Sequence, residues 1–441
     1  MPKHIRSVLL FLLSITTLTG VVWWHASSQP TTQQNKTVRL PLPTHKADKF
    51  WKGNLHTHSL WSDGNDYPEM IADWYRNHGY HFLTLSDHNT LSQGERWVSV
   101  THNGSGKRAL DKYKNRFGPV WVEERKVKGK HQVRLKPLAE FRSMLEQPGR
   151  FLLIPGEEIT HRFARNPVHI NGINLRDRIT PVDGSSVKET IQVNHRLVYE
   201  QQKKTGRNMM AFLNHPNFGW GIRAEDMVTA DELRFFEVYN GHPGVANYGD
   251  SVHPSTERMW DIVLALRLGK FKMEPVLGMC TDDAHRYHVF GVGKVNPGRG
   301  WIMVKTPFLT AENIVRAIRA GDYYCSTGVT LNNIRRDNKK YSFSIAGEPN
   351  VTYKTQFIVT RKTTSLESKA QKDKKGKPLN VTEIYDGKIG EIAATVEGLT
   401  PTYEMQGDEL YIRAKVISSK LHNNPYRAGD VEVAWTQPII P

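Results

Sequence analysis

The chain has 441 residues and a formal net charge of +16, which is enough length for one large domain and a small second one. Its two cysteines are too few for a disulfide framework. The positive charge comes with neither a helix-turn-helix signature nor a basic groove interleaved with aromatic residues, so we do not expect nucleic-acid binding.

Residues 1–28 read as a signal peptide or an N-terminal membrane anchor. A basic start precedes the uncharged stretch 8–24, and Ala26 and Ser28 follow at cleavage-like spacing. The stretch is long for a signal peptide and short for a membrane span, so cleavage and retention as a membrane tether are both open. We predict an exported protein, periplasmic or extracellular, in which residues 29–49, rich in Gln, Thr, Pro and Lys, form a linker.

After the linker, short apolar runs alternate with stretches of helical character. Most of these runs lead into or carry a polar residue that could bind metal or substrate, a pattern typical of a parallel α/β barrel with its site at the C-terminal rim. We predict seven strands, at 55–59, 82–85, 151–154, 168–173, 209–213, 233–238 and 276–279, and helices that include 67–78, 187–205 and 256–268.

Histidine and carboxylate residues stand at or just after the ends of these runs. Side chains two apart on a strand point to the same face, so His56 and His58 can bind one ion together. A lone strand histidine such as His169 would more often be structural, but the ordered set favours a site for several divalent cations. The candidate ligands are His56, His58, Asp63, His88, Glu158, His169, His215, Asp283 and His285.

In this order, the segments HTHSLWSDG, LSDHNT, GEEIT, the lone strand histidine, NHPN and DDAH resemble the motifs of the PHP (polymerase and histidinol phosphatase) superfamily of metal-dependent phosphoesterases. The resemblance implies a distorted seven-stranded β/α barrel over residues 50–332 with two or three divalent metal ions, either Zn, Mn or Fe. It also implies that His56, His58, Glu158 and Asp283 hold the first ion, Glu158 with His169 and His215 the second, and Asp63, His88 and His285 the third.

Two of these ligands have a neighbour of the same chemistry. Glu157 would replace Glu158, and Asp282 would replace Asp283, if the register of the motif shifted by one residue. We expect Asp87 to orient an imidazole rather than to bind metal itself.

Grouped divalent ions lower the pKa of a bound water and neutralise charge on a phosphoryl or carbonyl oxygen. We expect His161, Arg162 and Arg286 to serve as catalytic or substrate-binding groups at the rim, with Asn89 and Asn214 as further hydrogen-bonding groups. The two arginines suit a phosphate by bidentate contact, and surface ion pairing is the alternative for them.

Residues 333–441 contain alternating segments, YSFSI, TQFIVT and LYIRAKV, which predict a small β-sandwich-like domain that contributes no metal ligand. The segment GRGWIMVK at 298–305, the stretch 309–331 and the closing AWTQPI resemble the carbaryl-hydrolase-like branch of the PHP superfamily. In that branch a β-rich module follows the barrel.

These features predict an exported metal-dependent hydrolase, first of all a phosphoesterase that acts on a small anionic substrate. A hydrolase of carbamate, ester or amide bonds is the alternative that the C-terminal resemblance implies. A non-catalytic envelope binding protein is a third reading, which the retention of all the candidate ligands argues against.

Overall fold

The computed structural model describes residues 49–337 and 339–441. The predicted signal peptide or anchor, and the predicted linker up to residue 48, lie outside the described residues. None of the helices in the described ranges is long and apolar enough to span a membrane. Export therefore stays a prediction.

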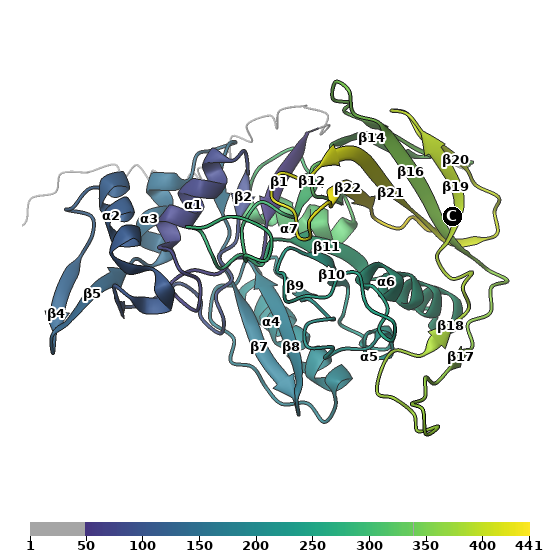
Figure 1. The fold of residues 1–441 in the computed structure, drawn as a ribbon, viewed down its shortest axis with the longest axis horizontal. Coiled ribbons are helices and arrows are strands. Elements are labelled where there is room, and N and C mark those ends of the chain that lie inside the picture. Colours follow the sequence, from purple (N-terminus) through teal and green to yellow (C-terminus); the bar gives the residue numbers. More distant parts are fainter. Residues whose placement is uncertain (1–48, 338) are drawn as a thin grey trace, which may run out of the picture. The chain divides into compact units, whose positions relative to one another are not determined.

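A five-stranded sheet carries much of the site (Figure 1). Its three parallel strands are buried almost throughout, as their apolar sequences predict. The strand order is β11 (Leu277–Thr281), β10 (Phe235–Asn240), β9 (Met210–Leu213), β8 (Asn166–Ile173) and β7 (Gly156–Phe163).

Strand β8 runs antiparallel to both β7 and β9, which corrects the prediction of an all-parallel sheet. β7 and β8 are joined by Ala164 and Arg165 alone, and so short a connection can link only antiparallel strands. Ala164 has a φ of 53°, as such tight turns require. The apolar runs predicted these strands but not the direction in which they run.

A nine-stranded sheet joins the N-terminal and C-terminal parts of the chain. β1, β2 and β6 pair in parallel, and the other neighbours pair antiparallel. The order is β19 (Glu391–Glu397), β16 (Tyr353–Arg361), β21 (Glu409–Leu421), β22 (Val431–Thr436), β13 (Tyr323–Ser326), β12 (Trp301–Lys305), β1 (Phe50–Asn54), β2 (Phe82–Leu83) and β6 (Leu152–Leu153).

The two large sheets approach each other at two isolated bridges. Thr57 pairs with Ala284, and His88 pairs with Glu158, both in parallel. Within the described residues no continuous ladder closes these strands into a barrel, so the predicted seven-stranded barrel is not confirmed. The fold is mixed α/β.

The predicted helices form close to their predicted bounds. In α4 (Val187–Thr205), Ser186 Oγ accepts a hydrogen bond from the N–H of Glu189, and Gly206 ends the helix with a φ of 70°. α1 (Pro68–Asn77) and α6 (Thr256–Ala265) also match. The others are α2 (Gly106–Phe117), α3 (Leu138–Leu145), α5 (Ala224–Val228), α7 (Ala311–Ala320), the 3₁₀ turn η1 (His102–Gly104) and the π turn η2 (Leu266–Phe271).

The largest core cluster packs α4 and α6 against the five-stranded sheet, with Ile191, Phe212 and Trp260 fully buried. These apolar side chains occupy the face of the sheet that the helices cover. Most polar residues of the motifs follow the ends of β1, β2, β9 and β11, whereas Glu158 lies within β7 and His169 within β8.

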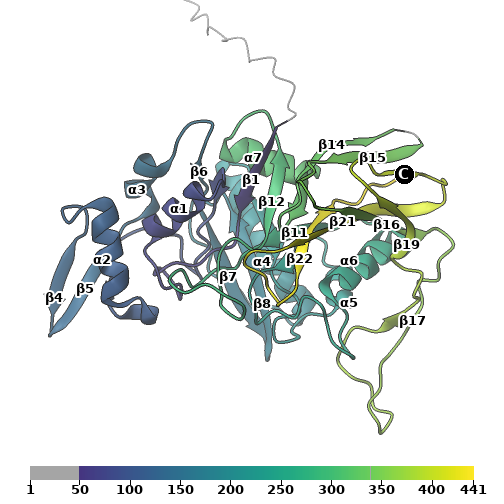
Figure 2. The ribbon, with the colours of Figure 1, turned by 45° about the horizontal axis from the view of Figure 1, so that its top comes forward.

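Strands dominate the C-terminal region, which lies beside α6 in Figure 2. The sheet β14–β15–β20 shares an aromatic core with β16 and β21, including Tyr341, Phe343 and Phe357. Because β16, β19, β21 and β22 continue the sheet of β1 and β12, a separate β-sandwich domain is not confirmed, and the boundary at residue 333 stays a prediction. The remaining strands are β14 (Leu331–Arg336), β15 (Lys340–Ile345), β20 (Thr402–Glu404), β3 (Arg96–Ser99), β4 (Glu124–Val127), β5 (Lys130–Leu135), β17 (Ser368–Lys369) and β18 (Ile384–Tyr385).

Candidate metal centre

The two histidines of the HTH motif lie just after β1 rather than inside a strand. The bridge from Thr57 to Ala284 holds this segment extended. His56 and His58 are fully buried, and their Nε2 atoms lie 3.3 and 3.2 Å from the same carboxylate oxygen, Oδ1 of Asp283. The two-residue spacing thus places both rings on one side of the chain, as predicted.

The structure brings all nine predicted ligands together. Their potential ligand atoms form four overlapping groups, and within each group all atoms lie within 4.8 Å of one another. The groups are His58, Asp63, His88 and His285; His56, His58 and Glu158; His56, His215 and Asp283; and His88, Glu158 and His169.

The first predicted ion site has the spacing of a coordination sphere. Besides the contacts with Asp283, His56 Nε2 lies 3.4 Å from Glu158 Oε1, and His58 Nε2 lies 3.5 Å from Glu158 Oε2. Ligand atoms about 2.0–2.2 Å from a tetrahedral ion are roughly 3.3–3.6 Å apart. Each of these nitrogen–oxygen distances therefore suits two ligands of one divalent ion, but Glu158 and Asp283 fall into separate groups, Glu158 with His56 and His58, and Asp283 with His56 and His215.

Two buried nitrogen atoms in this group lie within ion-pair distance of carboxylates but have no hydrogen-bond partner in the described part of the chain. Nε2 of His56 and Nε2 of His58 make no hydrogen bond with any described residue, although both rings are fully buried. An unsatisfied buried polar atom is costly and uncommon in a native protein. Both nitrogens face carboxylates, so a cation between them satisfies the whole set, and the residues fit a metal ion.

Glu158 lies at the centre of the other contacts. Its Oε1 is 3.1 Å from Nδ1 of His169 and 3.4 Å from Nε2 of His215, and its Oε2 is 2.6 Å from Nδ1 of His88. This position suits the predicted bridging role. The grouping differs from the predicted one, because His169 shares a group with His88 while His215 shares one with His56.

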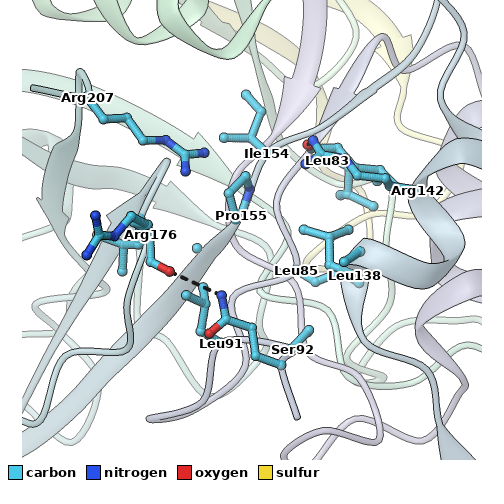
Figure 3. A pocket seen from close by; sticks show the side chains of 15 residues that line it. Leu83, Leu85, Leu91, Ser92, Leu138, Arg142, Ile154, Pro155, Arg176 and Arg207 are labelled. Atoms are coloured by element: carbon cyan, nitrogen blue, oxygen red, sulfur yellow. Dashed lines mark hydrogen bonds between the residues drawn. The ribbon is translucent and has the colours of Figure 1, made fainter. Parts of the chain in front are cut away.

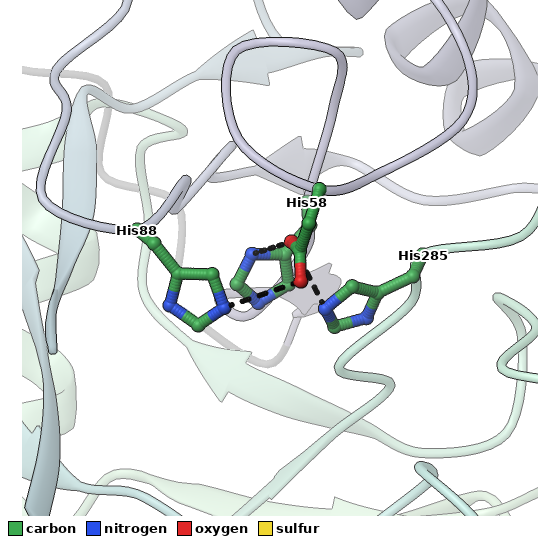
Figure 4. Close-up of side chains that lie close together, drawn as sticks. His58, His88 and His285 are labelled. Atoms are coloured by element: carbon green, nitrogen blue, oxygen red, sulfur yellow. Dashed lines mark ion pairs between the residues drawn. The ribbon is translucent and has the colours of Figure 1, made fainter. Parts of the chain in front are cut away.

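The third group is the most open to solvent. Figure 4 shows the rings of His58, His88 and His285 converging, with dashed lines for their ion pairs. Asp63 lies 3.6, 3.6 and 3.3 Å from these three rings, and its side chain is 52% exposed. An ion here would be the one that solvent and substrate reach first.

The pKa shifts suit metal binding at Glu158 and His58. Burial alone would raise the pKa of Glu158, but the imidazoles of His88, His169 and His56 hold it well below its usual value. Burial, with the charges of His285 and His88, lowers the pKa of His58 to about 3. A deprotonated carboxylate and a neutral imidazole are the forms that bind cations. Despite burial, the surrounding carboxylates raise the pKa of His56 and of His285, and raise that of His88 to about 11, so these three imidazoles would have to lose a proton to bind a cation.

The structure decides both ambiguous registers. Glu158 and Asp283 belong to the groups, whereas Glu157, on the opposite face of β7, accepts a hydrogen bond from the N–H of Ile179. Asp282 accepts hydrogen bonds from Tyr75 Oη at 2.7 Å and from the N–H groups of residues 298–300. Its role is to anchor that loop.

Asp87 does not orient an imidazole directly, which corrects the prediction. Its carboxylate accepts hydrogen bonds from the N–H and Oγ of Ser59 and from Oγ of Ser62, each at 2.7 Å. Asp87 therefore fixes the turn that carries Asp63.

The sequence analysis did not identify Glu237, whose carboxylate bonds to two of the candidate ligands. Its Oε1 is 2.7 Å from Nδ1 of His56, and its Oε2 accepts the N–H of His215 at 2.8 Å. Asn240 donates to both Glu237 and Asp283. A glutamate inside the buried run FFEVYN was the signal that could have revealed it.

His242 was also missed. Its ring centroid lies 5.5 Å from that of His285, and the N–H of Gly244 donates to its Nδ1 at 2.9 Å. With Nδ1 accepting, the proton is on Nε2. Burial lowers the pKa of His242 to about 4, so the ring is neutral at pH 7.

The predicted rim residues differ in their surroundings. His161 lies on the opposite face of β7 from Glu158 and pairs with Asp183 at 2.8 Å, so it does not join the cluster, because strand neighbours alternate between faces. Arg162 is exposed, and its guanidinium makes no hydrogen bond or ion pair with the described residues. Arg286 donates to the backbone oxygen of Asp63 at 3.0 Å, which places it beside the third group.

The two asparagines predicted as hydrogen-bonding groups contact different parts of the protein. Asn214 donates to Oε1 of Glu158 at 2.7 Å and so supports the central ligand. Asn89 exchanges hydrogen bonds with the backbone of Thr160 and ties its loop to β7.

No family model and no curated protein matches the sequence. Among solved structures, a two-domain protein from Bacteroides vulgatus, described as containing a predicted PHP-like metal-dependent phosphoesterase, matches with 14% identity, 90% of this chain and 97% of that chain covered, and a TM-score of 0.36. A candidate metal-dependent phosphoesterase from Bifidobacterium adolescentis matches with 14% identity, 61% and 95% coverage and a TM-score of 0.29.

An amidohydrolase from Chromobacterium violaceum matches with 16% identity, 34% of this chain and 36% of that chain covered, and a TM-score of 0.15. Likenesses this distant leave the function to be argued from the site itself. None of these descriptions names the carbaryl-hydrolase-like branch, which stays a prediction. The chain is thus similar to one solved structure described as containing a PHP-like metal-dependent phosphoesterase and to a second described as a metal-dependent phosphoesterase.

Proposed function

We propose that the protein is an exported metal-dependent phosphoesterase that hydrolyses a phosphate ester with two to three divalent ions. The observation that carries the proposal is that the buried Nε2 atoms of His56 and His58 make no hydrogen bond with the described residues, yet lie 3.2–3.5 Å from oxygens of Glu158 and Asp283, the spacing of two ligands of one ion. A cation between these groups would satisfy nitrogens that the described part of the protein leaves without a hydrogen bond.

The nine ligands would hold the ions, which when bound supply Lewis acidity and a water of lowered pKa. Glu237 and Asn214 fix the orientation of the ligands that they contact. At the open side, Arg286 places a permanent positive charge beside Asp63. His242 offers a neutral N–H donor near His285.

The charge of Arg286 favours a phosphate ester over a carbamate, because a phosphate oxygen is anionic in the ground state and a carbamate carbonyl is not. The hydrolase of carbamate, ester or amide bonds is the competing function, and the resemblance of the C-terminal segments supports it. The retention of all nine candidate ligands argues against a non-catalytic envelope binding protein.

We also propose that the strands form the distorted barrel that the PHP resemblance implies. The bridges Thr57–Ala284 and His88–Glu158 support this arrangement, because they link the edges of the two sheets. Both bridges involve the metal-ligand segments, so bound ions would draw the two edges together.

The first test is metal content. We expect purified protein to carry two to three divalent ions per chain by elemental analysis, a number that rests on the nine ligands and the shared Glu158. Glu158→Gln should lose most of this metal, whereas Glu157→Gln, altered at the adjacent residue on the opposite face of the strand, should keep it. Less than about one tightly held ion in the unaltered protein would refute the proposal.

The second test is a panel of phosphate monoesters, phosphate diesters, carboxyl esters and carbamates, assayed with Mn²⁺ and with Zn²⁺. Phosphate-ester hydrolysis that is lost in Glu158→Gln and retained in Glu157→Gln is the expected result. Hydrolysis of carbamates or carboxyl esters alone would favour the competing function, and full metal content with no hydrolysis would favour the binding protein.

A further inference from the structure

A cavity of about 210 Å³ lies where the two large sheets separate. The ladder of β6 ends at the hydrogen bond from the N–H of Ile154 to the oxygen of Leu83. Pro155 has no N–H to continue it, and β7 begins at Gly156 in the other sheet. The cavity is therefore built into the fold at the point where one sheet gives way to the other.

The walls of the cavity are about half apolar and half polar. Leu83, Leu85, Leu91, Leu138 and Leu153 form much of the apolar half, and Figure 3 shows several of these side chains around Ile154 and Pro155. An enclosed apolar cavity of roughly 150 Å³ accepts benzene. This cavity has room for a ring of that size and one polar substituent.

Three arginines line the same cavity, and two of them, Arg207 and Arg142, lie on either side of Ile154 and Pro155 in Figure 3. Arg207 donates hydrogen bonds from Nε and Nη2 to Oδ1 of Asn174. It forms no ion pair with a carboxylate of the described residues. Arg142 uses only Nη2, for Glu146 and the oxygen of Leu153. Both guanidinium groups keep an Nη1 that bonds no described residue.

The charge of the pair is not balanced. Burial lowers the pKa of Arg207, Glu312 opposes this shift, and the positive charge of Arg142 adds to it. One carboxylate, Glu146, pairs with Arg142 at 2.9 Å, and none pairs with Arg207 within the described part of the chain. Two guanidinium groups on one cavity with a single carboxylate partner attract an anion.

We propose that this cavity binds a small organic anion, whose compact apolar body lies among the leucines and whose carboxylate bonds to Arg207 within the field of Arg142. None of the nine candidate metal ligands lines the cavity. Leu83 and Leu85 pack into a hydrophobic cluster, whereas the candidate ligand His88 comes after this apolar segment has ended. The site is separate from the metal centre, and the inference is independent of the proposed function.

Benzoate is a suitable probe, because it combines a benzene ring with one carboxylate and is ionised at pH 7. Isothermal titration calorimetry should show one benzoate per chain, in metal-loaded and in chelator-treated protein alike. Benzyl alcohol has nearly the same shape without the charge and should bind at least about tenfold more weakly, as loss of a charge-assisted hydrogen bond predicts.

Arg207→Met and Arg142→Met should each weaken benzoate binding, Arg207→Met by about tenfold or more, while Arg207→Lys restores part of it. Arg176→Met is the matched control, because Arg176 lines the rim of the cavity but its guanidinium pairs with Asp177 and is 57% exposed. Ala139→Phe fills the cavity and should abolish binding, which keeps the test decisive if an arginine variant does not fold.

The proposal is overturned if benzyl alcohol binds as well as benzoate, if Arg207→Met and Ala139→Phe leave benzoate binding unchanged, or if no benzoate binds at all. Benzoate binding that disappears on metal removal and survives both variants would place the anion at the metal centre, which also overturns it.

Discussion

Glu237 decides the orientation of His56. Because its Oε1 lies 2.7 Å from Nδ1 of that ring, the carboxylate holds the proton on Nδ1 and leaves Nε2 free to face the cluster. Thr281 Oγ donates to the same oxygen, so the carboxylate itself is fixed. The metal affinity of the candidate site should therefore depend on Glu237, although Glu237 itself would not bind the metal.

We expect Glu237→Gln to lower metal affinity about 10–100-fold, the usual cost of altering such a partner. The amide would present either a neutral oxygen or an N–H to His56, and neither fixes the ring as a carboxylate does. Competition with a chromogenic chelator measures the change. Glu274→Gln, at a carboxylate that is 71% exposed and paired with Arg234, is the control. Equal affinity in both variants would contradict the role.

His169 and His215 test the alternative reading of strand histidines as core residues. Both contact Oε1 of Glu158, at 3.1 and 3.4 Å, and both retain some exposure. We expect His169→Ala and His215→Ala each to lower metal content and to reduce hydrolysis on the order of 100-fold. Far-UV circular dichroism should change little. Unfolding of both variants, while His131→Ala, at a half-exposed ring paired with Glu124, stays folded, would support the core reading instead.

At the scale of elements, helix α1 packs a buried carboxylate against α2. Glu69 is fully buried, and its Oε1 accepts hydrogen bonds from Tyr113 Oη at 2.6 Å and from Trp121 Nε1 at 3.1 Å. Its Oε2 has no hydrogen-bond partner among the described residues. Burial raises the pKa of Glu69 from 4.5 to about 7, despite these donors.

A raised carboxyl pKa makes the folded state bind the proton more tightly than the unfolded state does. The stabilisation is therefore complete below pH 4.5 and is lost as the pH rises to about 7. We expect the free energy of unfolding to fall over this range by about 1.4 kcal/mol per pH unit from this group. Glu69→Gln, followed by urea unfolding at several pH values, should remove that slope. The exposed Glu95→Gln should retain it, and identical slopes in both variants would refute the assignment.

The sequence predicted the positions of several strands but not their directions. Apolar runs indicated where β7, β8 and β9 lie, but their directions follow from the two-residue turn after Phe163. The segment between Asn89 and Leu152 was not predicted at all. It forms β3, β4, β5, α2 and α3, which pack aromatic residues such as Tyr113 into a core of their own.

At the scale of the whole molecule, the C-terminal strands join the rest of the chain through a buried ion pair. Arg413 on β21 bonds both carboxylate oxygens of Asp261 on α6, at 2.8 and 2.6 Å, and both side chains are nearly inaccessible. Tyr411 donates to Asp261 as well. This pair lies beside the core cluster that holds the five-stranded sheet.

We expect Arg413→Met to lower the free energy of unfolding by about 3–5 kcal/mol, because it leaves the charge of Asp261 buried without a positively charged partner. Replacing Asp261 by Leu in the same chain should recover most of the loss. Lys340→Met, at an exposed pair with Glu404, should cost less than about 1 kcal/mol. Chemical denaturation measures all three, and a cost for Arg413→Met no larger than that of Lys340→Met would contradict the argument.

The sequence by itself determined which residue types could form the site. The nine candidate ligands were predicted because histidine and carboxylate residues followed apolar runs in one order, and this pattern depends only on local chemistry and spacing. Helix bounds were predictable for the same reason, as the Ser186 cap and Gly206 show.

Only the tertiary structure decided which residue of each adjacent carboxylate pair faces the candidate site, and which other residues orient the candidate ligands. Glu157 and Glu158 have the same chemistry, and the face that each presents depends on the pairing of β7 with β8. Glu237 and His242 lie outside the motifs and reach the candidate ligands only through the fold. Contacts between distant segments follow from packing, which no local pattern contains. The candidate ligands could therefore be predicted from the sequence, whereas the residues that orient them and the cavity at Pro155 could not.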